Sequence, residues 1–198
     1  MKIKKTVSFY DTRFEKLGPV IQSVGWSNEA DQYKRFDLLF NNSDLTGKSI
    51  LDVGCGLGDL VEYLEKRGIR DYIYTGIDIS REFINFAELK YRNHNASFHV
   101  EDVLSLNNLS ADVVLASGAF SYRQFGMKKY VEKAIEKMYS ISNDFCSANF
   151  LSTEADYKLK KNQHYKPSWV LKQALSLSGN VELKYGSPKN EFTIVINK

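Results

Sequence analysis

Cysteine, proline and long apolar runs are scarce in this chain of 198 residues. Its two cysteines, Cys55 and Cys146, cannot form a disulfide framework, and no CxxC pair or Cys/His cluster indicates zinc. We expect both to be buried free thiols in a reduced, cytoplasmic protein. No apolar run reaches the roughly 18 residues of a membrane span, and the Lys-rich start lacks the apolar segment of a signal peptide. Only three prolines are present, and they mark no break between domains.

The charge balance is mildly basic, with a net charge of +3. This excess is too small to require a nucleic-acid partner, but it is uneven. From Tyr157 to the end there are eight lysines and only two acids, Glu182 and Glu191. A patch for an anionic substrate or an acidic partner is one interpretation, and a solvated basic face is the other.

Short apolar runs alternate with helical patterns along most of the chain. Helical spacing of apolar residues predicts helices over 57–67, 80–91, 127–141 and 167–177, with Ser80 as an N-cap and Pro167 in a first turn. The apolar runs predict strands over 49–53, 72–77, 97–100, 112–116, 145–150, 181–185 and 192–196. Alternation of this kind favours right-handed crossovers and a mostly parallel sheet covered by helices. Only "GSPKN" separates the last two strands, so they should form an antiparallel hairpin.

The stretch "LDVGCGLG" places an acid and three glycines where the first strand gives way to a helix. Glycines there permit positive φ and let a ligand lie against the backbone, beyond the carboxyl ends of the strands. The spacing G-x-G-x-G differs from the dinucleotide pattern G-x-G-x-x-G, and no GK[ST] follows to make a phosphate-binding loop. Asp52 precedes the first glycine and suits a cationic ligand better than a pyrophosphate.

Two further acids follow the next two strands. Asp78 ends "YTGID", where a carboxylate can accept hydrogen bonds from both hydroxyls of a ribose. Asp102 follows the third strand in "FHVED" and can receive an exocyclic amine. For each acid alone, a surface turn or a helix cap is an equal alternative. Their common register at successive strand ends favours a nucleoside ligand.

The motifs "LDVGCGLG", "GIDIS", "VEDV" and "ADVVLASGAF" together resemble those of the class I S-adenosylmethionine-dependent methyltransferases. The resemblance covers roughly Gly47 to the C-terminus. It implies an α/β fold with three layers, a Rossmann-like seven-stranded and mostly parallel sheet that ends in an antiparallel C-terminal hairpin. It also implies two parts, an N-terminal helical extension or lid over 1–46 and a methyltransferase domain over 47–198.

The resemblance assigns cofactor-binding roles residue by residue. It implies that the methionine portion of S-adenosylmethionine lies near Asp52 and Gly54, with Cys55 beside them, while Gly56 and Gly58 make room for the ligand. Asp78 would hold the ribose and Ile79 would pack on the adenine. Asp102 would bind the adenine amine beside Val103. The remaining pair, Ser117 and Gly118, would lie under the sulfonium, where the methyl acceptor arrives.

The N-terminal extension is rich in aromatic residues. Ser27 or Asn28 can cap a helix with an apolar face. By analogy with small relatives, we expect this helix to cover the cofactor. Arg35 would then pair with the cofactor's carboxylate, and Tyr10 and Trp26 would line the pocket. Core packing of the aromatics and a solvated arginine are the alternatives.

The acceptor side is less clearly marked. The family's [DN]PP[YF] motif is absent from "SGAFSYRQF", which disfavours adenine-N6 and glutamine acceptors. Ser117 and Asn149 stand where catechol-type relatives carry metal-binding acids, so we expect no metal. Phe120 and Arg123 are candidates for acceptor contacts. Tyr122 and His164 are catalytic candidates, His164 as a general base in a Lys-rich loop; a structural tyrosine and a solvated histidine are the alternatives.

These features predict an enzyme that transfers a methyl group from S-adenosylmethionine to an oxygen or nitrogen atom of a small molecule. Methylation of RNA or protein is an alternative that the basic C-terminal third keeps open. A non-catalytic cofactor-binding subunit is a further alternative. No membrane partner is expected, and the sequence leaves the oligomeric state open.

Overall fold

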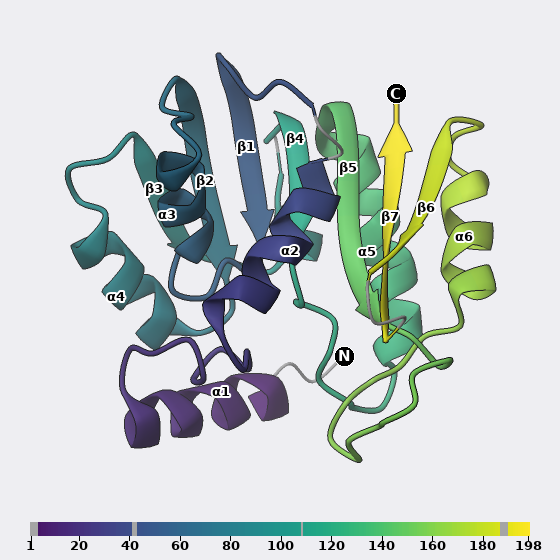
Figure 1. Cartoon of the computed structure of the whole chain (residues 1–198), viewed down its shortest axis with the longest axis horizontal. Coiled ribbons are helices and arrows are strands. Elements are labelled where there is room, and N and C mark those ends of the chain that lie inside the picture. The colour runs from purple at the N-terminus through teal and green to yellow at the C-terminus, as the bar shows by residue number, and fades with distance from the viewer. Residues whose placement is uncertain (1–3, 41–42, 108, 187–189) are drawn as a thin grey trace.

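The computed structural model describes residues 4–40, 43–107, 109–186 and 190–198. A single sheet forms its centre, with helices on both faces (Figure 1). The strands are β1 Lys48–Val53, β2 Tyr72–Asp78, β3 Ala96–Val100, β4 Ala111–Ala116, β5 Ser142–Leu151, β6 Val181–Tyr185 and β7 Glu191–Asn197. The helices are α1 Lys4–Leu17, α2 Glu29–Phe40, α3 Asp59–Lys66, α4 Arg81–Lys90, α5 Met127–Ile141 and α6 Pro167–Leu175, with one 3₁₀ turn, η1 Val103–Ser105.

The seven strands lie in the order β3-β2-β1-β4-β5-β7-β6. The first five are parallel to one another, and β7 runs antiparallel to both β5 and β6. The expected mostly parallel sheet with a reversed strand near its edge is therefore confirmed. Most of the "GSPKN" connection, 187–189, lies outside the described residues.

The expected helices form close to their predicted bounds, and their end signals act as proposed. The Ser80 hydroxyl accepts a hydrogen bond from the Phe83 amide at 3.4 Å, which caps α4. Pro167 occupies the first turn of α6, where a missing amide hydrogen is harmless. At α2, the Asn28 side chain accepts from the Asp31 amide at 2.9 Å, so Asn28 is the cap.

Two apolar clusters fix the layers. One packs α5 and α6 against one face of the sheet, and the other packs α2, α3 and α4 against the opposite face. Phe36, Leu39 and Phe40 of α2 belong to the second cluster, beside Ile50 of β1 and Val195 of β7. The helix therefore joins the hydrophobic core that the sheet itself builds.

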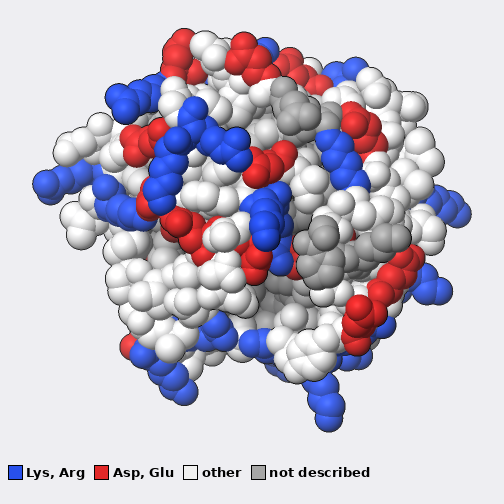
Figure 2. Space-filling view, viewed as in Figure 1, with Lys and Arg blue, Asp and Glu red and all other residues white. Residues whose placement is uncertain are grey.

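The remaining helix, α1, lies across the edge where the parallel strands end (Figure 1). It packs against α4 and also contacts Tyr122 through Phe9. None of the described helices has the length and apolar character needed to cross a membrane. On the face drawn in Figure 2, lysine and arginine are interspersed with acidic residues and do not gather into one basic field.

Candidate active site

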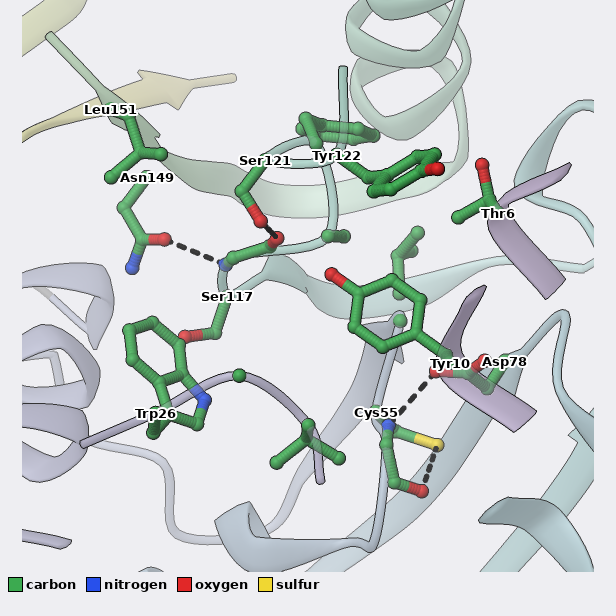
Figure 3. A pocket seen from close by; sticks show the side chains of 18 of the residues that line it. Thr6, Tyr10, Trp26, Cys55, Asp78, Ser117, Ser121, Tyr122, Asn149 and Leu151 are labelled. Carbon is green, nitrogen blue, oxygen red and sulfur yellow. Dashed lines mark hydrogen bonds between the residues drawn. The ribbon is translucent and has the colours of Figure 1, made fainter. Parts of the chain in front are cut away.

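A cavity of about 350 Å³ lies at the carboxyl ends of the parallel strands. Residues from the ends of β1 to β5 form one wall of the cavity. Residues of α1, α2 and the segment between them form the opposite wall. In an open α/β sheet, ligands bind at this edge because the crossover loops diverge there. Figure 3 shows Trp26, Ser117 and Asn149 on one side of the cavity, and Cys55 and Asp78 on the other.

The glycine-rich turn after β1 reaches the cavity through its first two glycines. Gly54, Gly56 and Gly58 all have positive φ, which side chains other than glycine rarely adopt. A Cβ added at Gly54 would lie 2.7 Å from the Ala119 Cβ, and one at Gly56 would lie 2.9 Å from Val24. Both glycines line the cavity, so the turn holds bare backbone at its wall.

Gly58 was expected to make room for a ligand, and the structure corrects this. A Cβ at Gly58 would lie 2.7 Å from the Tyr91 ring and 3.0 Å from the Phe98 ring. Gly58 does not line the cavity. The glycine therefore lets two aromatic side chains pack against the start of α3.

Asp52 is buried at the end of β1 and lines the cavity. Its Oδ2 accepts a hydrogen bond from the Tyr74 hydroxyl at 2.8 Å. Burial raises the pKa of Asp52 to about 7, and the nearby carboxylates of Asp78 and Asp59 add to the rise. A cation bound in the cavity would oppose these effects and favour the ionised form.

Asp78 is buried at the end of β2. Its Oδ2 accepts from the Gly56 amide at 3.0 Å, and its Oδ1 accepts from the Ser80 amide at 2.9 Å. Burial raises its pKa to about 6, although these backbone hydrogen bonds oppose the rise. The backbone amides of Gly56, Ser80 and Ile79 thus hold the carboxylate in place.

Asp102 follows β3 and lines the cavity next to Ile79 and Val103. Its Oδ1 accepts from the Leu104 amide at 3.0 Å and from the Tyr130 hydroxyl at 2.7 Å. Both bonds fall on the same oxygen, so Oδ2 keeps acceptor capacity. The Tyr130 contact comes from α5 and carries no signal in the local sequence.

The ends of β4 and β5 supply polar atoms of a different kind. The Gly118 amide donates to Asn149 Oδ1 at 2.8 Å, which fixes the orientation of the Asn149 amide (Figure 3). Ser117, Gly118 and Phe120 line the cavity. Asn149 also lines it, although the sequence indicated it only as a position without a metal-binding acid. Within the described residues, no group of three or more potential metal ligands occurs.

Tyr10 of α1 and Trp26 of the segment between α1 and α2 line the cavity, as the sequence predicted. Burial raises the pKa of the Tyr10 phenol. Trp26 lies between Arg35, whose Cζ is 3.9 Å from the ring centroid, and Gly118, where an added Cβ would lie 2.9 Å from the indole. The indole thus packs against the bare backbone that follows β4.

Arg35 also lines the cavity, but its guanidinium already has a protein partner. Nε and Nη2 donate to the two carboxylate oxygens of Glu191, the first residue of β7. Glu191 also lines the cavity. The structure therefore pairs Arg35 with a carboxylate of this chain, a contact that no sequence pattern indicates.

Two of the predicted acceptor-side residues do not line the cavity. Arg123 is exposed, and its amide donates to the Lys161 carbonyl at 2.9 Å. His164 lies in the connection between β5 and α6, and burial lowers its pKa. Isolated bridges, Tyr122 to Asn162 and Ser152 to Tyr165, tie this connection down. They bring Tyr122 and Asn162 to the cavity and leave His164 outside its lining.

Four buried atoms of the lining make no hydrogen bond within the part of the chain that the structure describes. They are Thr6 Oγ1, Gln32 Oε1, Ser117 Oγ and Asn149 Nδ2. A buried polar atom without a partner costs roughly 1–3 kcal/mol, so such atoms are normally satisfied by water or a ligand. Their grouping around one cavity indicates a polar ligand, and sequence patterns did not single out Thr6 or Gln32.

Comparisons with known proteins agree with this geometry. The family model described as "Methyltransferase domain" matches residues 50–143. A protein named as a methyltransferase in Mycobacterium tuberculosis is 30% identical over 158 residues, which span 76% of this chain and 93% of that protein. The ubiquinone biosynthesis O-methyltransferase of Neisseria meningitidis serogroup C is 31% identical over 103 residues, 45% of this chain and 42% of that enzyme.

A solved structure with the same fold is the magnesium protoporphyrin IX methyltransferase of Synechocystis with bound S-adenosylhomocysteine. It superposes with a TM-score of 0.70 over 96% of this chain and 98% of that one, at 13% identity. The strand-end cavity, the ordered acids and these relatives lead to one assignment. The chain belongs to the class I S-adenosylmethionine-dependent methyltransferases, enzymes whose methyl donor is S-adenosylmethionine.

Proposed function

We propose that this enzyme methylates an oxygen or nitrogen atom of a small molecule inside the cavity. The observation that carries the proposal is the helical cover. Residues of α1, such as Phe9 and Tyr10, and the segment around Trp26 line the cavity opposite the strand ends. A cavity walled from both sides admits a small acceptor and excludes a large folded one. Residues 1–46 would act as the lid of the methyltransferase domain.

The lining fits the proposed cofactor. Asp78 would accept hydrogen bonds from the ribose hydroxyls, and backbone amides hold its carboxylate in place for that role. Asp102 Oδ2 would accept the adenine amine, with Ile79 and Val103 against the ring. Asp52 provides negative charge for the cationic end of the ligand, and its Tyr74 hydrogen bond keeps it in place.

The cofactor supplies a methyl group that is already activated by its positive sulfur. The protein then has to bind and align an acceptor, and alignment can supply roughly 7–11 kcal/mol of the barrier in favourable cases. Gly54 and Gly118 leave bare backbone at the centre of the cavity, and Trp26 covers it. Aromatic rings also favour a neighbouring sulfonium.

The test is isothermal titration of the purified protein with S-adenosylmethionine, S-adenosylhomocysteine and NAD. We expect binding of the first two and none of NAD. Asp78→Asn should weaken S-adenosylmethionine binding roughly 10- to 100-fold, because an amide group cannot accept on both sides.

A matched control is Asp112→Asn. Asp112 also accepts a backbone hydrogen bond, from Ser49 at 2.8 Å, and it does not line the cavity. This variant should bind like the wild type. Wild-type affinity in Asp78→Asn would refute the ribose role, and binding of NAD alone would refute the proposed function.

A further inference from the structure

The two halves of the cavity differ in chemistry. The ends of β1, β2 and β3 carry the carboxylates Asp52, Asp78 and Asp102. The ends of β4 and β5, on the other side of β1 in the sheet order, carry Ser117 and Asn149. We propose that the methyl acceptor is a carboxylic acid with an apolar body, and that Asn149 Nδ2 and Ser117 Oγ bind its carboxylate. This inference rests on the proposed function and names its substrate class.

The two donors lie next to each other because of strand register. Ala116 pairs with Ala148 between the parallel strands β4 and β5, so Ser117 and Asn149 follow at neighbouring positions. Asn149 is only 4% exposed. Its Oδ1 accepts from the Gly118 amide, its buried Nδ2 has no partner in the described chain, and the residue lines the cavity. Two buried donors at one place suit a ligand with two acceptor oxygens.

Apart from Tyr122, this half of the cavity provides poor candidates for a general base. His164 does not line the cavity. The carboxylate of Glu191 is held by both donors of Arg35, and burial raises the pKa of the Tyr10 phenol. An alcohol or an ammonium acceptor must lose a proton before or during transfer. A carboxylate is already a deprotonated nucleophile near neutral pH.

The surroundings fit an apolar body with an anionic head. The Phe9 and Tyr122 rings lie 4.6 Å apart between centroids, and Leu151 and Leu159 continue the apolar lining. Two cations flank Phe9. Arg13 Cζ and Lys161 Nζ each lie 5.7 Å from its ring centroid, and both residues line the cavity. Their positive charge favours the approach of an anion to the wall around Phe9.

The chemical step balances without any proton transfer. A lone pair of a carboxylate oxygen forms the new bond to the methyl carbon. The bond between that carbon and the sulfur breaks, and its electron pair stays on the sulfur. The products are a neutral methyl ester and S-adenosylhomocysteine, so the charges of the anion and the sulfonium cancel.

A matched series of probes tests the acceptor class. We would titrate the protein, saturated with S-adenosylhomocysteine, with 3-phenylpropanoate, 3-phenylpropanol and 3-phenylpropylamine. The acid should bind at least about 10-fold more tightly than the other two, and with S-adenosylmethionine it should yield the methyl ester. Equal or tighter binding of the alcohol or the amine, or methylation of either in preference to the acid, would overturn the inference.

A charge substitution tests the two donors. In Asn149→Asp one oxygen still accepts from Gly118, and the other replaces a donor with a negative charge. Binding of 3-phenylpropanoate should fall at least about 100-fold, while affinity for S-adenosylmethionine should not fall. The control is Asn143→Asp at the opposite end of β5, where the side chain donates to Asp112 outside the cavity.

The outcomes separate the two proposals. Failure of the wild type to bind S-adenosylmethionine would contradict the proposed function. Cofactor binding without binding of 3-phenylpropanoate would contradict only the inference drawn from Asn149 and Ser117. Asn149→Asp could instead lose affinity for S-adenosylmethionine and keep its binding of 3-phenylpropanoate. That result would assign Asn149 to the cofactor's own carboxylate and would also overturn the inference.

Discussion

Asp52→Asn should make the protein more stable at alkaline pH and a poorer binder of its cationic cofactor. Asp52 is buried beneath the cavity, and burial raises its pKa from the usual 3.8 to about 7. The substitution keeps the shape of the side chain, and the amide oxygen can still accept from Tyr74. It removes the charge, which is the property that burial penalises, and replaces the other carboxylate oxygen with an amide nitrogen.

The sign and size follow from proton linkage. Between pH 3.8 and about 7 the folded protein holds a proton on Asp52 that the unfolded chain has released, so the free energy of unfolding falls as pH rises. Each pKa unit of difference between the folded and unfolded states is worth ~1.36 kcal/mol. The shift from 3.8 to about 7 therefore lowers the free energy of unfolding by on the order of 4 kcal/mol at high pH. Roughly 3 kcal/mol of it should develop between about pH 4.5 and about pH 8.

Urea denaturation of the wild type and of Asp52→Asn across this pH range measures the effect. The difference between the two free energies of unfolding should grow with pH in favour of the variant. Asp78, whose pKa is raised to about 6, remains in both proteins, but the variant also relieves its repulsion by the Asp52 charge, which adds to the same difference. Parallel pH profiles of the two free energies of unfolding would refute the inference that Asp52 is buried without a compensating charge.

Cofactor binding supplies the second half of the test. A sulfonium near Asp52 favours its ionised form, so the wild type should release protons when it binds S-adenosylmethionine near neutral pH. S-adenosylhomocysteine has an uncharged sulfur and should release fewer. The preference for S-adenosylmethionine over S-adenosylhomocysteine should shrink in Asp52→Asn, as measured by calorimetry in buffers of different ionisation enthalpy.

Three further substitutions, one of them paired with a control, test the geometry of the site. Gly118→Ala places a Cβ 2.9 Å from the Trp26 indole and should weaken cofactor binding about 10-fold. The control Gly126→Ala is also at positive φ but in open space, so it should reduce stability by ~1 kcal/mol without altering cofactor affinity. Equal effects of the two variants on cofactor affinity would contradict the packing argument. Gly58→Ala should destabilise the fold by roughly 1–3 kcal/mol through Tyr91 and Phe98 in thermal denaturation, and an unchanged melting temperature would contradict that reading. His164→Gln should leave the pH profile of methyl transfer unchanged; loss of a titration near neutral pH would restore His164 as the base.

Most of the fold was predictable because its signals are local. The strand β1 is a short apolar run, and its end is marked by Gly54, so the pattern places Asp52 at the sheet edge without any tertiary information. Ser80 and Pro167 mark helix starts by their own hydrogen-bonding and steric properties. The short connection before β7 excludes a helical crossover and therefore reverses the last strand.

Residues that meet across the cavity were predictable only in part. Arg35 and Glu191 are 156 positions apart, and their pairing depends on how α2 packs on β5 and β7. Asn162 reaches the cavity in place of His164 because isolated bridges set the path of the connection between β5 and α6. Neither contact follows from a periodic pattern.

The sequence by itself determined the alternation of strands and helices and the acids at successive strand ends, because both depend on residues that are neighbours along the chain. Tertiary structure decided which side chains share one cavity. It placed the Asn149 donor, which has no partner among the described residues, beside Ser117 through strand register, and it set Gly58 against Tyr91 and Phe98, outside the cavity lining. Such contacts are set by the packing of distant elements, and packing has no signature in any short stretch of sequence.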